Sequence, residues 1–242
     1  MKQIDLNCDL GEGFEHDHDL MPLITSANIA CGGHAGDATT MQATVALAKR
    51  YHVRIGAHPG YADREHFGRR EIPLSARDLE RLLADQIAAL CVWGPIRHVK
   101  PHGALYNLAV RDRAVAEVIV AAVQSIDRSL ILFGLAGSEL VKAGEARGLR
   151  VAAEVFADRS YQRDGSLTPR TRSDALIENE NIAAAQVLQI VIEGTVRATD
   201  GNDVPLKADT ICLHGDGDRS VEFARRLRRE LENAGIQVEP VQ

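Results

Sequence analysis

The amino-acid sequence predicts an α/β protein, an irregular seven-stranded parallel β/α barrel that forms a single domain over residues 1–242. Short apolar segments alternate with stretches of helical period along the chain, which is typical of parallel α/β folds. Seven of these segments read as strands, and this number favours a slightly incomplete barrel over an open doubly wound sheet. Polar residues also gather at the carboxyl ends of the segments, where such barrels assemble active sites.

The expected strands are short, and a polar turn follows each of them. They read QIDLNCDL (3–10), SANIAC (26–31), VRIGAH (53–58), RHVKPH (97–102), LILFGL (130–135), VAAEVFAD (151–158) and DTICLHG (209–215). Successive side chains of a strand point to opposite faces of the sheet. Whether a residue points into the barrel therefore depends on its parity, that is, on whether it occupies an odd or an even position along the strand.

Helices are expected between the strands. The clearest spans residues 75–94, where Ser75 and Asp78 are placed to cap the start and the apolar stripe comprises Leu79, Leu82, Leu83, Gln86, Ile87 and Leu90. A similar stripe in residues 218–235 ends at Gly235, which suits a helix stop. Further helices are expected over 37–51, 111–126 and 173–195, and another directly after residue 102.

Composition and charge limit the classes of partner. With 45% hydrophobic residues, 26% charged residues and a net charge of −6, the chain offers no basic surface for nucleic acid or anionic lipid. It has no apolar run of membrane-spanning length and no signal-peptide core. The four cysteines lie in apolar segments without a Cys-x-x-Cys spacing, as buried thiols in a reducing compartment do. We therefore expect a cytoplasmic protein that binds neither nucleic acid nor membrane.

The fourth expected strand carries three ionisable residues on one face, His98, Lys100 and His102. Burying such groups is costly unless they are paired, so we interpret them as one wall of a polar site. His102 comes last and is expected to reach the mouth, whereas His98 lies deepest and is expected to be mainly structural. Because the lysine is a costly group, we expect Lys100→Met to abolish turnover and to leave the melting temperature unchanged or raised.

Other strands place polar residues on the same parity. These are Asp5, Asn7 and Asp9 in the first strand, Asn28 and His34 in and after the second, His58 in the third, Glu154 and Asp158 in the sixth, and Cys212, His214 and Asp216 in and after the seventh. Small residues follow four of the histidines (HAG, HPG, HGA and HGD) and would let a ligand approach the backbone. We therefore expect one shared polar site at the mouth of the barrel.

Two loops are interpreted separately. The HDHD tract, residues 16–19, resembles a metal-chelating sequence but lies in a polar loop, and we interpret it as solvated surface. Residues 157–172 exceed the usual connection length, and we expect a mobile lid there, with Arg159 near the mouth and Gly165 allowing a turn. Phosphate-loop, dinucleotide, zincin and serine-hydrolase motifs are absent from the sequence.

Six ordered blocks resemble the LamB/YcsF family over nearly the whole chain. They are DLNCDLGEGF, SANIACGGHAGD, IGAHPGYADREHFGRR, VKPHGALYN, EVFADRSYQRDGSLTPR and CLHGDG. The resemblance implies a barrel akin to the glycoside hydrolase and polysaccharide deacetylase group. It also implies that the chain acts with 5-oxoprolinase subunits B and C in the ATP-dependent opening of 5-oxoproline (pyroglutamate) to L-glutamate.

The residues allow roles to be proposed for that reaction. Lys100 and Arg159 suit the substrate carboxylate or a transferred phosphate. Asp9 together with one of the histidines could act as the general base toward the attacking water. Asp158, Asp216 and Asp218 could coordinate the Mg²⁺ ion bound to ATP. The residues assigned to catalysis are Asp9, His34, His58, Lys100, His102, Asp158 and His214, and those assigned to substrate binding are Asn7, Glu12, Arg159 and Asp216.

Two other functions stay open on the sequence. One is a stand-alone metal-dependent hydrolase of the amide or carbohydrate deacetylase type, with Asp9, His34 and either His58 or His102 as ligands of a divalent metal. The other is a non-catalytic binding protein of a larger complex. The many ionisable groups expected at the barrel mouth disfavour this function, because a purely structural subunit has little reason to bear the cost of burying them. A metal content measurement distinguishes the first of these from an ATP-dependent lactamase.

Overall fold

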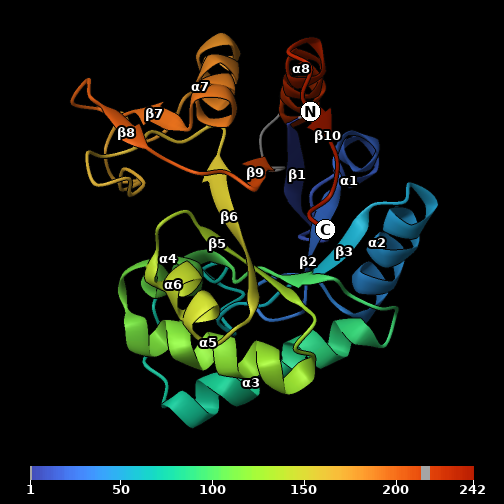
Figure 1. The fold of residues 1–242 in the computed structure, drawn as a ribbon. Helices are drawn as coiled ribbons and strands as arrows, with labels where there is room; N and C mark the ends of the chain where they lie inside the picture. The colour runs from blue at the N-terminus through green and yellow to red at the C-terminus, as the bar shows by residue number, and fades with distance from the viewer. Residues whose placement is uncertain (1, 214–218) are drawn as a thin grey trace.

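Seven parallel strands close into a barrel in the structure, a computed structural model that describes residues 2–213 and 219–242 (Figure 1). Each strand pairs with the next, and β1 pairs with both β2 and β9, which closes the ring. All seven expected segments contain a barrel strand, so the predicted fold is confirmed. The strands are β1 (Gln3–Leu10), β2 (Ser26–Ala30), β3 (Arg54–His58), β4 (His98–Val99), β5 (Ile131–Leu135), β6 (Arg150–Phe156) and β9 (Thr210–Leu213).

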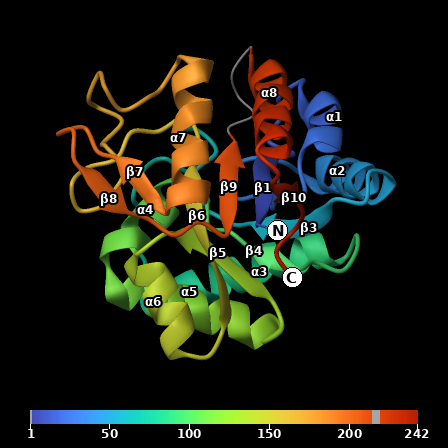
Figure 2. The ribbon, with the colours of Figure 1, turned by 45° about the horizontal axis from the view of Figure 1, so that its top comes forward.

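Helices cover the outside of the barrel, because their apolar stripes pack on the outward faces of the strands (Figures 1 and 2). In α3, Leu79, Leu83, Ile87 and Leu90 are buried as expected, and the Ser75 hydroxyl accepts a hydrogen bond from the Asp78 N–H. The helices are α1 (Asp17–Leu20), η1 (Met21–Leu23), α2 (Ala38–Arg50), α3 (Ala76–Cys91), α4 (Gly103–Arg111), α5 (Arg113–Ile126), α6 (Glu139–Ala146), α7 (Glu180–Glu193) and α8 (Ser220–Asn233).

Three details differ from the expected elements. The helix expected over 173–195 begins only at Glu180, because residues before it are bonded to the preceding loop through the Ile177 N–H and the Asp158 carbonyl. A hairpin of β7 (Thr195–Arg197) and β8 (Asp203–Pro205) and a short strand β10 (Gln237–Val238) beside β1 were not expected. β4 is shorter than residues 97–102, since Pro101 has no N–H to donate.

The parity of the strands is as expected, and the barrel interior combines the polar residues of the other strands with apolar residues of β5 such as Phe133. Beyond β4 the Lys100 N–H still donates to the Ala57 carbonyl and the His102 N–H to the Pro59 carbonyl, so the alternation continues to residue 102. On the opposite face of β1, Ile4, Leu6 and Cys8 pack in the outer hydrophobic core.

His98 lies inside the barrel, as the sequence predicts. Its ring stacks on Phe133 with 4.2 Å between centroids, and its Nε2–H donates to Asn28 Oδ1 at 2.8 Å. A methyl group on Gly56 would lie 2.0 Å from His98 Nε2, so glycine is required there. Burial lowers the pKa of His98 to about 3, and the imidazole is therefore neutral.

The amino-terminal end of the barrel is closed around Asp5. Its carboxylate accepts hydrogen bonds from the hydroxyls of Thr25 at 2.7 Å, Ser26 at 2.6 Å and Thr210. Burial raises the pKa of Asp5 from 3.8 to about 6, and these hydrogen bonds offset only part of that effect.

Asp5→Asn is expected to raise stability most at neutral and higher pH. The folded state holds the Asp5 proton more tightly than the unfolded state, so the contribution of Asp5 is fully present below about pH 4 and is lost as the pH rises through about 6. The free energy of unfolding of Asp5→Asn minus that of the wild type should therefore grow by on the order of 3 kcal/mol between pH 4 and pH 7. Urea unfolding of both proteins across this range measures it, and a difference that is flat or falls with pH would contradict it.

Candidate active site

A cavity of about 640 Å³ opens at the carboxyl ends of the barrel strands. Its wall combines acidic, basic and imidazole groups with an apolar side formed by helix α4 and β5. The lining residues are Asp9, Glu12, His58, Phe67, Arg69, Lys100, Pro101, His102, Gly103, Ala104, Tyr106, Asn107, Val110, Arg111, Leu135, Phe156, Arg159 and residues 166–170.

Lys100 is the centre of a buried charge network at the floor of this cavity. Its Nζ lies 2.9 Å from Asp9 Oδ1 and 2.9 Å from Glu154 Oε1, and it also donates to Asn7 Oδ1 at 3.2 Å. Burial disfavours the ammonium, but the attraction of Asp9 foremost outweighs it and raises the pKa of Lys100 well above its ordinary value. The lysine therefore compensates two carboxylates, and the expectation that Lys100→Met keeps or raises the melting temperature no longer holds.

Asp9 is oriented by this network. Lys100 Nζ and Asn28 Nδ2, at 2.8 Å, both contact its Oδ1, while Oδ2 lies 3.3 Å from His58 Nε2. Only 15% of the side chain is exposed. Asp9 is thus a positioned carboxylate in contact with the cavity.

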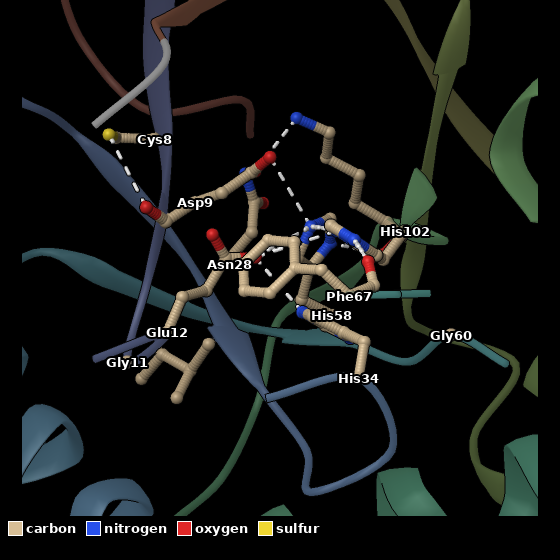
Figure 3. A network of polar contacts seen from close by, with 12 residues as sticks. Cys8, Asp9, Gly11, Glu12, Asn28, His34, His58, Gly60, Phe67 and His102 are labelled. Carbon is tan, nitrogen blue, oxygen red and sulfur yellow. Dashed lines mark hydrogen bonds and ion pairs between the residues drawn. The ribbon is translucent and has the colours of Figure 1, made fainter. Parts of the chain in front are cut away.

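Three imidazoles gather beside Asp9 and Glu12 at the ends of β1, β2 and β3 and at the start of α4 (Figure 3). His102 Nδ1 lies 3.0 Å from His58 Nε2, and the His102 ring stacks on His34 with 3.6 Å between centroids. Glu12 Oε1 contacts all three rings, at 2.9 Å from His34 Nε2, 3.5 Å from His102 Nδ1 and 3.9 Å from His58 Nε2.

Two glycines with positive φ angles allow the backbone to pass close to these rings. Gly68 has a φ of +63°, and a methyl group there would lie 2.8 Å from the His34 Cβ. Gly103 has a φ of +56°, and a methyl group would lie 2.6 Å from the Gly68 carbonyl oxygen. Gly68 therefore leaves room for His34, and Gly103, directly after His102, lets the backbone of α4 approach that of Gly68.

The pKa values of the three histidines are shifted in opposite directions. Burial, together with the nearby His58, lowers the pKa of His34 to about 3 and that of His102 to about 2. Burial also opposes the charged form of His58, but Asp9 outweighs it and raises the pKa of His58. The cluster thus pairs two neutral imidazoles with one that is held close to a carboxylate.

Four arginines, Arg69, Arg111, Arg159 and Arg170, contribute to the cavity wall. The Arg159 guanidinium donates to the carbonyls of Thr168 at 2.6 Å and Ala175 at 3.3 Å, so it ties together the loop after β6. Residues 166–170 of that loop face the cavity, and Gly165 adopts a φ of +81° at its turn. Part of the loop after β6 therefore lies at the cavity, and its closure over the mouth stays a prediction.

The structure brings most of the sequence-predicted residues together. Asp9, Glu12, His58, Lys100, His102 and Arg159 line the cavity. His34 packs behind His102, and Asn7 lies beneath, bonded to Lys100. Asp158 is not among the described residues that line the cavity, and its carbonyl accepts from the Ile177 N–H. His214, Asp216 and Asp218 lie outside the described residues.

Sequence reasoning assigned no site role to several residues of the network and the cavity wall, among them Glu154, Tyr106, Arg69 and Arg170. Glu154 was on the correct parity but was given no role, although it contacts Lys100 and accepts from the Tyr106 hydroxyl at 2.7 Å. Tyr106 lies in the first turn of α4, four residues after the N-cap residue His102, whose carbonyl oxygen accepts from the Tyr106 N–H. Arg69 and Arg170 lie in loops, where no periodicity signals their direction.

The HDHD tract is exposed only in its second half. His16 and Asp17 are half-buried, and residues 17–20 form helix α1 where a loop was expected. His18 and Asp19 are 64% and 66% exposed in their side chains, and Asp17 accepts from the Gly11 N–H at 2.7 Å. Each of the four cysteines is a free thiol. Within the described residues, none of the helices has the length and apolar character needed to cross a bilayer.

Comparison with known proteins places the fold among β/α barrels and the sequence in one family. A family 4 carbohydrate esterase from Streptomyces lividans matches with a TM-score of 0.55 and 10% identity, covering 100% of this chain and 93% of that one, which is a likeness of fold. The chain belongs to the LamB/YcsF family, whose model matches residues 4–242.

Relatives within the family match along nearly their full length. The 5-oxoprolinase A subunit of Bacillus subtilis (strain 168) is 52% identical and covers 98% of this chain and 96% of its own, and that of Histophilus somni (strain 129Pt) is 51% identical, covering 98% of each. The crystal structure of a lactam utilization protein from Thermus thermophilus matches with a TM-score of 0.93 and 41% identity, covering 98% of this chain and 99% of that one. These relatives do not favour the stand-alone deacetylase-type hydrolase.

Proposed function

We propose that this chain is the A subunit of an ATP-dependent 5-oxoprolinase, which hydrolyses the cyclic amide 5-oxo-L-proline to L-glutamate together with subunits B and C. The observation that carries the proposal is the match of about 50% identity, over nearly the full length, to proteins named as the A subunit of 5-oxoprolinase. The cavity at the mouth of the barrel supports it, because it holds a carboxylate, imidazoles and cations within a small space.

The chemistry explains why such a site would be coupled to ATP. A five-membered lactam is a poor electrophile. Transfer of the γ-phosphoryl group from ATP to its amide oxygen releases ADP and activates the ring carbon. When water adds to that carbon, the carbon–nitrogen bond breaks with the nitrogen leaving as an amine, and a second water hydrolyses the resulting acyl phosphate to L-glutamate and phosphate. This reaction requires cations near the substrate carboxylate and the phosphate, and a base near the water. ATP with Mg²⁺ is the cofactor of this proposal.

The geometry suggests a division of roles among the cavity residues. Asp9 is the base we favour, because Lys100 and Asn28 hold one of its oxygens and orient the carboxylate at the cavity floor. Lys100 is a positioning residue, since its ammonium is held by the side chains of Asp9, Glu154, Asn7 and Cys212. Arg69 and Arg170 are the cations we assign to the substrate carboxylate or the phosphate.

Reconstitution tests the proposal directly. Glutamate and phosphate release from 5-oxoproline, ATP and Mg²⁺ would be followed with this chain alone, with subunits B and C alone, and with all three. We expect release only from the complete mixture, in which one phosphate accompanies each glutamate. Glutamate release by this chain alone, or none from the complete mixture, would contradict the proposal. We place the reaction in the cytoplasm, as the cysteine pattern predicts.

The loop over residues 157–172 is expected to become protected when the substrates bind. Arg163, Arg170 and Arg172 are exposed sites for trypsin, and the loop lines the cavity from its open side. Limited proteolysis of the complex of this chain with B and C should cleave there more slowly after 5-oxoproline and nucleotide are added. Equal cleavage rates in the presence and absence of these small molecules would count against a lid.

A further inference from the structure

The ring nitrogens of the imidazole cluster are oriented so that a cation between them would be stabilised. His58 Nδ1 lies 2.8 Å from the Lys100 carbonyl oxygen, and His102 Nε2 lies 2.9 Å from the Phe67 carbonyl oxygen. A carbonyl oxygen only accepts, so both of these outer nitrogens carry hydrogen. In the neutral rings the inner nitrogens, His58 Nε2 and His102 Nδ1, then carry lone pairs that face each other at 3.0 Å (Figure 3).

Lone pairs at this distance repel unless a positive charge lies between them. Both imidazoles are buried, so water cannot reorient to compensate. A donated N–H to a backbone carbonyl is also how proteins orient metal-ligating histidines, because it fixes the tautomer and points the other nitrogen at the ion. His58 and His102 both show that arrangement.

Two more ligand atoms complete the group. Glu12 Oε1 and His34 Nε2 join His58 Nε2 and His102 Nδ1, and one ligand atom from each of the four residues lies within 4.8 Å of the others. Four of the six ligand pairs, those from Glu12 Oε1 to the three rings and that between His58 and His102, are separated by 2.9 to 3.9 Å. The His34 and His102 rings are stacked, so one of them must tilt for both of their in-plane lone pairs to reach one ion. A tetrahedral ion with bonds of about 2.0–2.1 Å separates its ligands by about 3.3 Å, which falls inside this range.

We propose that Glu12, His34, His58 and His102 form a binding site for one divalent transition-metal ion of the zinc class. The donor set of three nitrogens and one carboxylate oxygen suits zinc, cobalt or nickel, whereas Mg²⁺ and Ca²⁺ prefer oxygen ligands. The ion is thus distinct from the Mg²⁺ that accompanies ATP. Because the lactamase itself would hold this ion, metal content alone does not separate it from a deacetylase-type hydrolase, contrary to the expectation from the sequence. The carboxylate ligand is Glu12, which contacts all three rings, and not Asp9, the ligand considered from the sequence.

The rival arrangement is a proton in place of the metal. In that case His58 is an imidazolium that donates from Nε2 to Asp9 or to His102, and the cluster binds no ion. The two arrangements differ in metal content and in the spectrum of the histidines, and neither measurement depends on 5-oxoprolinase activity.

The experiment uses the full chain, stripped with a chelator and then titrated with Zn²⁺ and, separately, Co²⁺. We expect one ion per chain, a rise in melting temperature with Zn²⁺, and the intense visible absorption of tetrahedral cobalt. Glu12→Gln and His58→Asn should each weaken Zn²⁺ binding by at least about 100-fold, since even loss of an outer-shell contact costs about 10–100-fold. Circular dichroism would show whether each variant is folded.

The matched control removes two histidines that lie outside the cluster. The double variant His16→Ala/His18→Ala, in the HDHD tract, should bind Zn²⁺ as the wild type does. If that variant loses binding while Glu12→Gln keeps it, the site is wrong. Absence of saturable binding by the stripped wild type, with a proton shared between His58 and His102 in nitrogen-resolved NMR, would also overturn the proposal.

Discussion

Lys100→Met is expected to abolish turnover and to lower the free energy of unfolding by about 3–5 kcal/mol. The substitution leaves Asp9 and Glu154 facing each other in the barrel without the ammonium that lies 2.9 Å from each of them. Lys100 is 2% exposed, so solvent cannot take over this role. Denaturant unfolding and the glutamate-release assay of the reconstituted complex measure the two effects.

Lys142→Met is the matched control. Its ammonium pairs with Glu139 at the same 2.9 Å distance, but 57% of the lysine side chain is exposed, so the change should stay below about 1 kcal/mol. The double variant Lys100→Met/Glu154→Gln should regain part of the lost stability, because it removes one of the two stranded charges. An unchanged or raised melting temperature for Lys100→Met alone would show that the network does not stabilise the barrel.

His98→Ala and His102→Ala are expected to separate stability from activity. His98 is enclosed by Phe133 and Gly56 and donates to Asn28, so its truncation leaves a cavity and an unsatisfied oxygen. We expect a loss of about 2–4 kcal/mol and a measurable residual rate. His102 lines the active-site cavity, and its truncation should lower the rate by about 100-fold or more, with a smaller loss of stability. The reverse pattern would place the functional end of the strand at His98.

The fold could be predicted because strands and helices differ in the period of their apolar residues. The same parity argument correctly placed His98, Lys100 and His102 on one inward face, since a period of two decides which face every residue of a strand occupies. The start of α7 was misplaced because the Asp158 carbonyl binds the segment before it, and no local pattern records a contact with a distant loop.

The partners of each charge could not be predicted in the same way. The sequence shows that Lys100 is buried, but not that Asp9 and Glu154 flank it at equal distances, and this pairing reverses the expected effect on stability. Glu12 was predicted to bind substrate, because a glycine-rich turn gives no sign that its carboxylate reaches three imidazoles. Which side chains meet across a barrel depends on register and loop path.

The central claim is that the ring of 5-oxoproline is opened at the polar cavity of this chain. The most direct measurement compares glutamate release by complexes that contain Asp9→Asn or Asp5→Asn, each assembled with subunits B and C. Both substitutions remove one carboxylate from the same face of β1, but Asp9 lines the cavity and Asp5 closes the opposite end of the barrel. We predict a loss of about 100-fold or more for Asp9→Asn and a rate close to wild type for Asp5→Asn. A near-normal rate for Asp9→Asn in an assembled complex would contradict the account.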